Sequence, residues 1–255
     1  MSTIIIDAGN SYLKIAIVDN LDNSQLSYAV LTYNNLSDDL CDYLHDCNAT
    51  EVLISNVNNL TIFHTISDLI YGLWRIHAQL VVVEQNRFGI STRYNNPRTL
   101  GCDRWLALIA AHQEFTKTVC VIDCGTAVTI DVITDNGMHI GGLISPGIST
   151  ARHSLGQKTN NLPMVENHIE NNNNSSSFLA NNTQDAILGG TLYQISAYIE
   201  RIVSEFKQEF GDNTESIITG GDAQLILGLS AHHIHHRETL VLDGLRIVAK
   251  EMFNG

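Results

Sequence analysis

Two short stretches of the sequence end an apolar run with Asp, one further residue and Gly. They are IIIDAGNS, which contains Asp7, and CVIDCGTA, which contains Asp123. A Gly just beyond a strand lets the backbone turn sharply and approach a ligand, so that consecutive N–H groups point at phosphate oxygens. The Asp adds a carboxylate that holds Mg²⁺, its water shell or a monovalent cation. Either stretch alone is more typical of an ordinary strand-ending turn, but the pair predicts phosphate binding.

Polar residues beside the two turns fit the same chemistry. Asn10, Ser11 and Thr126 add amide or hydroxyl groups, and Lys14 on the predicted return strand adds a compact positive charge. The sequence has neither a G-x-x-x-x-G-K-[ST] loop nor a G-x-G-x-x-G turn. We therefore expect a phosphate-binding fold of a different kind.

The first half of the chain is predicted to place its turn within a three-stranded meander followed by alternating helices and strands. The expected strands are Ile4–Ile6, Leu13–Val18, Ala29–Tyr33, Val52–Ser55 and Leu80–Glu84, and the expected helices are Leu36–Asp46, Thr61–Tyr71 and Cys102–Phe115. The second half begins in the same way, with strands at Val119–Asp123, Ala127–Thr134 and Met138–Ser145. This repeat is too long for a solenoid unit. It predicts two similar α/β domains, residues 1–116 and 117–255, with a ligand clamped between them.

The rest of the second half combines a polar stretch with a long helix. ENNNNSSSF, Glu170–Phe178, is expected to be a loop, with a plain connection favoured over a substrate lid. The next helix has apolar residues at helical spacing from Leu188 to Phe206, which favours packing against its own sheet and leaves pairing with a second subunit open. The remaining predicted elements are a strand Ser216–Gly221, a helix Asp222–Leu229, a strand Glu238–Leu245 and a final helix through Phe253.

Composition excludes several classes of function. The 255 residues include 14 Lys and Arg against 27 Asp and Glu, a formal net charge of −13, which argues against a nucleic-acid partner. No apolar run approaches the length of a membrane span, and no secretory signal is recognised, so we expect a cytoplasmic protein without a membrane partner. Five cysteines without Cys-x-x-Cys spacing support neither a disulfide framework nor a zinc ribbon.

The histidine-rich stretch HHIHH, His232–His236, has two interpretations. Four imidazoles in five positions could bind Ni²⁺ or Zn²⁺ adventitiously. A surface tract leading into the strand at Thr239–Leu242 is favoured, because no Cys or carboxylate set completes a closed metal site.

Taken in order, seven stretches resemble the type III pantothenate kinases, a family within the superfamily of sugar kinases, Hsp70 and actin. The resemblance covers nearly the whole chain. The matching pieces are DAGNSYLK (Asp7–Lys14), YNNPRTLGCDR (Tyr94–Arg104), DCGTAVTID (Asp123–Asp131), GGLISPG (Gly141–Gly147), NLP (Asn161–Pro163), Thr183 and TGGDA (Thr219–Ala223).

The resemblance implies a fold, a reaction and partners. The fold is two ribonuclease-H-like domains with the active site in the cleft between them. The reaction is the ATP-dependent phosphorylation of pantothenate to 4′-phosphopantothenate, the first step of coenzyme A biosynthesis. It uses Mg²⁺ and a monovalent cation, K⁺ or NH₄⁺, and the enzyme is a homodimer.

The resemblance also assigns roles to residues of this sequence. Asp7 would orient the water shell of Mg²⁺, and Asp123 would bind the monovalent cation. The residues implied to contact ATP are Asp7, Ala8, Gly9, Asn10, Ser11, Tyr12, Leu13, Lys14 and Thr126. Those implied to bind pantothenate are Tyr94, Gly101, Cys102, Asp103, Arg104 and Thr183, the last from the partner subunit.

Asp103 is the predicted catalytic residue. It lies at the start of a predicted helix beside Arg104, and we expect the helix end and the guanidinium to favour its ionised form. Such a carboxylate can take the proton of the substrate hydroxyl as the general base. Outside the family context a helix cap would be the more typical role. Two alternatives stay open, a non-catalytic accessory or transcriptional regulator of the same fold and a related small-molecule kinase.

Overall fold

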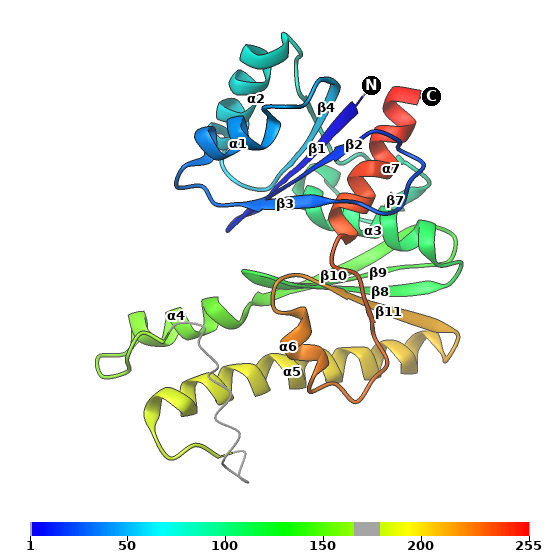
Figure 1. The fold of residues 1–255 in the computed structure, drawn as a ribbon. Helices are drawn as coiled ribbons and strands as arrows, with labels where there is room; N and C mark the ends of the chain where they lie inside the picture. Colours follow the sequence, from blue (N-terminus) through cyan, green and yellow to red (C-terminus); the bar gives the residue numbers. More distant parts are fainter. Residues whose placement is uncertain (1, 166–178, 255) are drawn as a thin grey trace. The chain divides into compact units, whose positions relative to one another are not determined.

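The computed structural model describes residues 2–165 and 179–254, and Figure 1 shows its ribbon. The predicted loop Glu170–Phe178 lies outside the described residues. The chain forms two compact units. The first comprises Met1–Lys117, Asp131–Gly141 and Thr239–Gly255, and the second Thr118–Ile130 and Gly142–Glu238. The expected domains, 1–116 and 117–255, stay a prediction.

The first unit contains a five-stranded sheet in the order β3-β2-β1-β4-β5. The central strand β1 (Ser2–Ala8) pairs antiparallel with β2 (Leu13–Val18) and parallel with β4 (Ala49–Asn56). The outer strands are β3 (Tyr28–Leu31) and β5 (Gln79–Leu80). The apolar run at the centre of β1 is fully buried, as expected for a strand covered on both faces.

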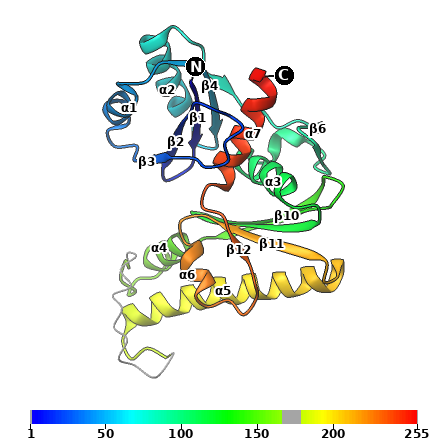
Figure 2. The same cartoon turned by 45° about the vertical axis from the view of Figure 1, so that its right-hand side comes forward.

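Four helices cover this sheet. Helices α1 (Leu36–Leu44) and α2 (Leu60–Trp74) lie on one face, and α3 (Cys102–Glu114) and α7 (Leu240–Asn254) lie on the other (Figures 1 and 2). The side chains of β1, β2 and β4 form one apolar core with α1 and α2. The predicted helices of this half are confirmed.

The second sheet repeats the strand order of the first. Its order is β12-β11-β8-β9-β10-β7-β6. Its strands β10-β9-β8-β11-β12 correspond in order to β3-β2-β1-β4-β5 of the first sheet. Strand β11 is parallel to β8, as β4 is parallel to β1. The strands are β6 (Asn86–Arg87), β7 (Ile90–Thr92), β8 (Thr118–Cys124), β9 (Ala127–Ile133), β10 (Met138–Pro146), β11 (Thr214–Thr219) and β12 (His235–His236). This repeat confirms the predicted fold class, α/β with two ribonuclease-H-like halves.

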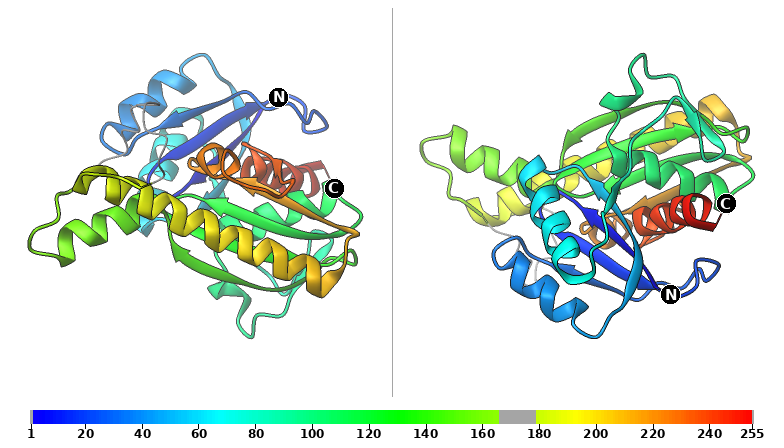
Figure 3. Two further views of the ribbon diagram at one scale, coloured as in Figure 1. Left: turned by 90° about the horizontal axis from the view of Figure 1, so that it is seen from below. Right: turned by 90° about the horizontal axis from the view of Figure 1, so that it is seen from above.

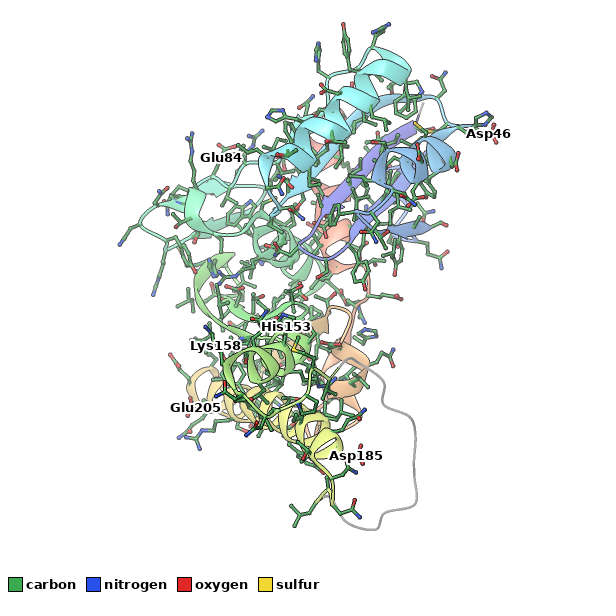
Figure 4. The ribbon with its side chains drawn as sticks, turned by 90° about the vertical axis from the view of Figure 1, so that its left-hand side faces the viewer. Asp46, Glu84, His153, Lys158, Asp185 and Glu205 are labelled. Atoms are coloured by element: carbon green, nitrogen blue, oxygen red, sulfur yellow. The ribbon has the colours of Figure 1, made fainter. Side chains whose placement is uncertain are left out.

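The described part of the second unit contains helices α4 (Ile148–Lys158), α5 (Thr183–Phe210) and α6 (Ala223–Leu227). Helix α5 packs against β8 and β11 along the sheet (Figure 3). Its buried side chains include Ile195, Ile199 and Phe206 from the predicted apolar stripe. Helix α4, where Figure 4 labels His153 and Lys158, lies beside the part of α5 that contains the labelled Asp185. The stripe therefore packs within its own chain, as favoured from the sequence.

The predicted strand at Glu238–Leu245 is wrong, because helix α7 begins at Leu240. The apolar run there has strand-like composition, yet Val241, Leu245 and Val248, spaced as on one face of a helix, are all buried. Thr239 Oγ1 donates to Asp243 Oδ2 at 2.7 Å, and Asp243 N donates to Thr239 O at 2.8 Å, which closes the first turn. The parallel edge strand of the sheet is β12 instead.

Other boundaries also differ from the sequence predictions. The strand expected at Leu80–Glu84 spans Gln79–Leu80, and the hairpin β6–β7 and helix α4 were not predicted. Over the described ranges, no helix combines the length and the apolar character that a membrane crossing requires.

Candidate active site

The first Asp-x-Gly turn joins β1 to β2 in the first unit. Gly9 N donates to Tyr12 O at 3.1 Å, and a Cβ added to Gly9 would lie 3.1 Å from the same oxygen. Gly9 O accepts from Tyr33 Oη at 2.5 Å and from Asn58 Nδ2 at 3.0 Å. Residues 10–12 are exposed at the tip. The N–H of Gly9 thus closes the turn, and neighbouring side chains hold the turn in place.

The side chain of Asp7, the acidic residue of this turn, is largely buried. Asp7 is 9% exposed and is the register partner of Lys14 on β2. Lys14 is half-buried, with Nζ 6.0 Å from the centre of the Tyr28 ring. Ala8 and Leu13 are fully buried, so only their backbone is suited to contact a ligand. The pairing brings one acidic and one basic side chain to the end of the hairpin.

The second Asp-x-Gly turn joins β8 to β9, mostly in the second unit. Gly125 N donates to Ala127 O at 3.1 Å. Thr126 O accepts from Gly147 N at 3.0 Å and from Thr150 Oγ1 at 2.6 Å, whereas the Thr126 side chain is exposed. The backbone of this turn is thereby fixed by the residues at the start of α4.

Glycine turns from three parts of the sequence meet at the end of β8. A Cβ at Gly147 would lie 2.0 Å from Gly125 O. At Gly220, where φ is +97°, a Cβ would lie 2.4 Å from Cys124 O and 2.5 Å from Asp123 Oδ1. The Asp123 carboxylate therefore lies directly against the backbone of a second turn, in space that any side chain would fill.

A buried arginine connects the helices beside this turn. Arg152 on α4 is 1% exposed and donates from Nε to Thr191 Oγ1 at 2.9 Å and from Nη2 to Leu188 O at 3.3 Å, both on α5. Asp222 N donates to Cys124 O at 3.0 Å. Burial raises the pKa of Asp222, and the charge of Arg152 opposes this effect. No motif in the sequence indicated a role for Arg152.

Asp103 lies in the first turn of α3, in the first unit. Its Oδ1 accepts from Arg104 N at 2.7 Å and lies 2.5 Å from where a Cβ of Gly101 would be. Burial raises the pKa of Asp103, and the N–H and charge of Arg104 oppose this effect only partly. The N–H groups at the helix start and the guanidinium favour the ionised form, as expected, but desolvation outweighs them, and the pKa is raised.

The Arg104 guanidinium is engaged in a buried ion pair. Nε donates to Asp131 Oδ2 at 2.7 Å and Nη2 donates to Asp131 Oδ1 at 2.6 Å. Nη1 donates to Tyr94 Oη at 3.3 Å. Burial alone would lower the pKa of Arg104, but the hydrogen bonds to Asp131 raise it. Asp131 ends the DCGTAVTID stretch, and nothing in the sequence alone indicated that it pairs with Arg104.

Cys102 contributes no reactive thiol. Its Sγ lies 3.1 Å from Ser55 Oγ in the interior, and burial raises the pKa of Cys102 to about 12. Gly101 and Cys102 line a cavity of about 580 Å³ within the first unit. Other residues around this cavity include Asn56, Asn58, Val81, Val83 and Arg98. A small molecule thus has a recess beside the start of α3.

Thr183 belongs to the second unit, whereas the other predicted substrate residues belong to the first. It is the first residue of α5 and is exposed. It lines a cavity of about 310 Å³ together with Leu155 on α4 and Ile187 on α5.

The histidine-rich stretch contains the short strand β12. His235 Nε2 lies 3.0 Å from Glu215 Oε2, and His232 Nε2 lies 3.6 Å from Glu200 Oε2. Ile234 is buried between them in the sequence. Within residues 2–165 and 179–254, no three His, Cys, Asp or Glu side chains are grouped as for a metal ion. His235 and His232 thus each lie close to a glutamate side chain in the second unit.

We expect Gly220→Ala to destabilise the second unit by about 1 to 3 kcal/mol, because the added methyl group meets Cys124 O and Asp123 Oδ1 at a positive φ. Gly221→Ala is the matched control, since a Cβ there has no heavy atom within 4 Å. Urea unfolding measures both free energies. Equal stabilities for the two variants would contradict the close contact at Gly220.

Comparisons with known proteins agree with the motifs. A family model described as type III pantothenate kinase matches residues 3–205. A type III pantothenate kinase of Nitrosococcus oceani is 32% identical over 254 residues, covering 97% of this chain and 94% of that protein. A solved structure of a Campylobacter jejuni protein, described as a Baf family transcriptional activator, has a TM-score of 0.61 at 22% identity and covers 99% of this chain and 100% of its own.

A second solved structure, of a Sinorhizobium meliloti protein described as a 2-dehydro-3-deoxygalactonokinase, has a TM-score of 0.55 at 11% identity. It covers 98% of this chain and 99% of its own. These two structures show the fold alone. The match of the family model over most of the sequence shows more, and the chain belongs to the type III pantothenate kinase family.

Proposed function

We propose that Asp103 is the general base with which this chain phosphorylates pantothenate. The reaction itself follows from the family: ATP donates a phosphoryl group to pantothenate, which gives 4′-phosphopantothenate in coenzyme A biosynthesis. The observation that supports the role of Asp103 is its desolvated carboxylate at the start of α3, beside the cavity that Gly101 and Cys102 line.

The chemistry of Asp103 follows from its surroundings. Because Oδ1 accepts the Arg104 N–H, we assign Oδ2 to the substrate hydroxyl. A carboxylate whose pKa is raised by burial is a stronger base than one in water, and it takes the hydroxyl proton as the phosphoryl group moves. Gly101 leaves room for this carboxylate, since a side chain there would meet Oδ1.

Each of the two Asp-x-Gly turns is proposed to contact phosphate groups of ATP through its own polar groups. The exposed tip at residues 10–12, Lys14 and the exposed Thr126 hydroxyl are suited to phosphate oxygens. Asp7 is suited to hold Mg²⁺ through water, and the ion would neutralise phosphate charge when bound. We further propose that the enzyme works in the cytoplasm, without nucleic-acid or membrane partners, in keeping with its net charge of −13.

Tyr94 and Arg104 are the proposed side-chain contacts to pantothenate in the first unit, and Gly101 and Cys102 contribute backbone. Because Asp131 balances the charge of Arg104, we propose that Arg104 acts on pantothenate mainly as a hydrogen-bond donor and not as an unpaired positive charge. Thr183 is the proposed contact from a second subunit.

Replacing Asp103 with Asn should lower kcat for pantothenate phosphorylation by at least about 100-fold, because the amide cannot accept the proton. The variant should melt no lower than the wild type, since it keeps an acceptor for Arg104 N and removes a buried charge. Product formation from ATP, Mg²⁺, K⁺ and pantothenate measures the effect. Full activity of the variant would refute the general base, whereas an inactive wild type would favour the non-catalytic alternative.

The pH dependence of the wild type has a defined sign. The raised pKa of Asp103 means that its carboxylate is deprotonated only above the ordinary aspartate range. Its kcat/KM for pantothenate should therefore fall as the pH decreases through that raised value, and the acid limb should lie above the ordinary aspartate pKa. An acid limb at or below that pKa would contradict the assignment.

Asp123 is the proposed ligand of the monovalent cation. Its carboxylate lies against main-chain turns, and oxygen ligands of this kind suit K⁺ or NH₄⁺. Exchanging K⁺ for Na⁺ at constant ionic strength should lower the rate at least about tenfold in the wild type. The Asp123→Asn variant should show the lower rate in both the K⁺ salt and the Na⁺ salt. Equal wild-type rates in K⁺, Na⁺ and choline chloride would argue against this site.

We also propose that the enzyme is a homodimer with α5 at the interface. Tyr193 on α5 is 49% exposed, and Thr183 starts the same helix. Sedimentation should give twice the chain mass, and Tyr193→Asp should give monomers. Leu60→Asp on α2, where Leu60 is 66% exposed, is the control and should remain dimeric. A monomeric wild type at tens of micromolar would refute the proposal.

A further inference from the structure

Five residues of the first unit are joined by hydrogen bonds into a closed ring that begins and ends at Tyr94. Tyr94 N donates to Thr92 Oγ1 at 3.2 Å, and Thr92 Oγ1 lies 2.8 Å from His139 Nδ1. His139 Nε2 lies 2.9 Å from Asp131 Oδ1. Arg104 binds Asp131 through two hydrogen bonds and donates from Nη1 to Tyr94 Oη at 3.3 Å. One continuous chain therefore holds both the backbone and the hydroxyl of Tyr94.

Each contact in the ring has a donor and an acceptor, with Asp131 accepting from both of its neighbours and Arg104 donating to both of its own. An ionised carboxylate only accepts, so His139 Nε2 donates to Asp131. Nδ1 of a neutral imidazole then accepts from the Thr92 hydroxyl, whose oxygen in turn accepts from Tyr94 N. With a neutral imidazole, the positive charge of Arg104 and the negative charge of Asp131 balance within the ring. Because Arg104 Nη1 occupies a lone pair of Tyr94 Oη, the phenolic hydrogen is directed to another acceptor.

The ring lies in the interior, except at Tyr94. The exposed fractions are 2% for Thr92, 0% for His139, 2% for Asp131 and 7% for Arg104, whereas Tyr94 is half-buried. The members come from β7, β9, β10, α3 and the segment after β7, and the rings of Tyr94 and His139 lie 5.5 Å apart. Buried hydrogen bonds of this kind restrict the side chains that they join.

We propose that Thr92, His139 and Asp131 are positioning residues, which fix Tyr94 as a hydrogen-bond donor to an acceptor oxygen of pantothenate. This inference rests on the proposed function, in which Tyr94 and Arg104 contact pantothenate. The ring acts on substrate binding and not on proton transfer, since none of its three inner members needs to touch the substrate. Neither the motif resemblance nor the family match assigns a role to these three residues.

Thr92→Val tests the proposal with little change of shape, because it removes the hydroxyl that joins Tyr94 N to His139. We expect KM for pantothenate to rise about 5- to 20-fold, with kcat and KM for ATP within about threefold of the wild type. Thr92→Ser keeps the hydroxyl and should restore KM for pantothenate to within about twofold of the wild type. His139→Ala should have the same effect as Thr92→Val, and His139→Gln, which keeps a donor for Asp131, should restore part of it.

A double-variant cycle with Tyr94→Phe determines whether the ring acts through the tyrosine hydroxyl. If it does, KM for pantothenate of the double variant should be less than about twofold higher than that of Tyr94→Phe alone. Calorimetric titration with pantothenate alone should follow the same order. The proposal would be overturned if Thr92→Val lowered the melting temperature but left KM for pantothenate unchanged. It would also be overturned if Thr92→Val raised the KM values for pantothenate and for ATP equally, or if the effects of Thr92→Val and Tyr94→Phe on KM for pantothenate were fully additive. The activity of the wild-type enzyme with pantothenate tests the proposed function by itself, because it is measured without any comparison between variants.

Discussion

The buried ion pair between Arg104 and Asp131 determines the electrostatic state of the candidate active site. A guanidinium whose charge was unopposed beside Asp103 would lower the pKa of that carboxyl and make it a weak base. Here Asp131 accepts two hydrogen bonds from Arg104, and burial remains the dominant influence on Asp103. The sequence places Asp103 and Arg104 side by side, but the partner that balances the arginine, Asp131, comes from within strand β9.

The strand order explains why two Asp-x-Gly turns occur in one chain. Each sheet has a central strand, β1 or β8, that runs into a glycine turn and returns as a neighbouring strand. At Gly9 the turn is held by the Tyr33 hydroxyl and the Asn58 amide, whereas at Gly125 it is held by the backbone of Gly147 and the Thr150 hydroxyl. Repetition of one topology therefore supplies two similar turns, and unrelated neighbours fix each of them.

Much of this arrangement follows from sequence, and the remainder depends on tertiary contacts. The apolar runs at Ile4–Ile6 and Val119–Asp123 are strands as predicted, because both belong to sheet centres. The run at Thr239–Leu242 has similar composition but forms a helix, since its first turn is closed by Thr239 and Asp243. His139 and Thr92 come together only because β7 pairs with β10, and no local sequence pattern predicts this pairing. Likewise, the raised pKa of Asp103 depends on burial, which the neighbouring Arg104 in the sequence does not reveal.

The most direct test of the account is the titration of the Asp103 carboxyl carbon by NMR, with the resonance identified by its loss in Asp103→Asn. We expect a midpoint above the ordinary aspartate value of about 3.9, because the carboxylate is desolvated and the nearby guanidinium is paired. We also expect kcat/KM for pantothenate to follow the same midpoint. A midpoint at or below the ordinary value in an active enzyme would contradict the account.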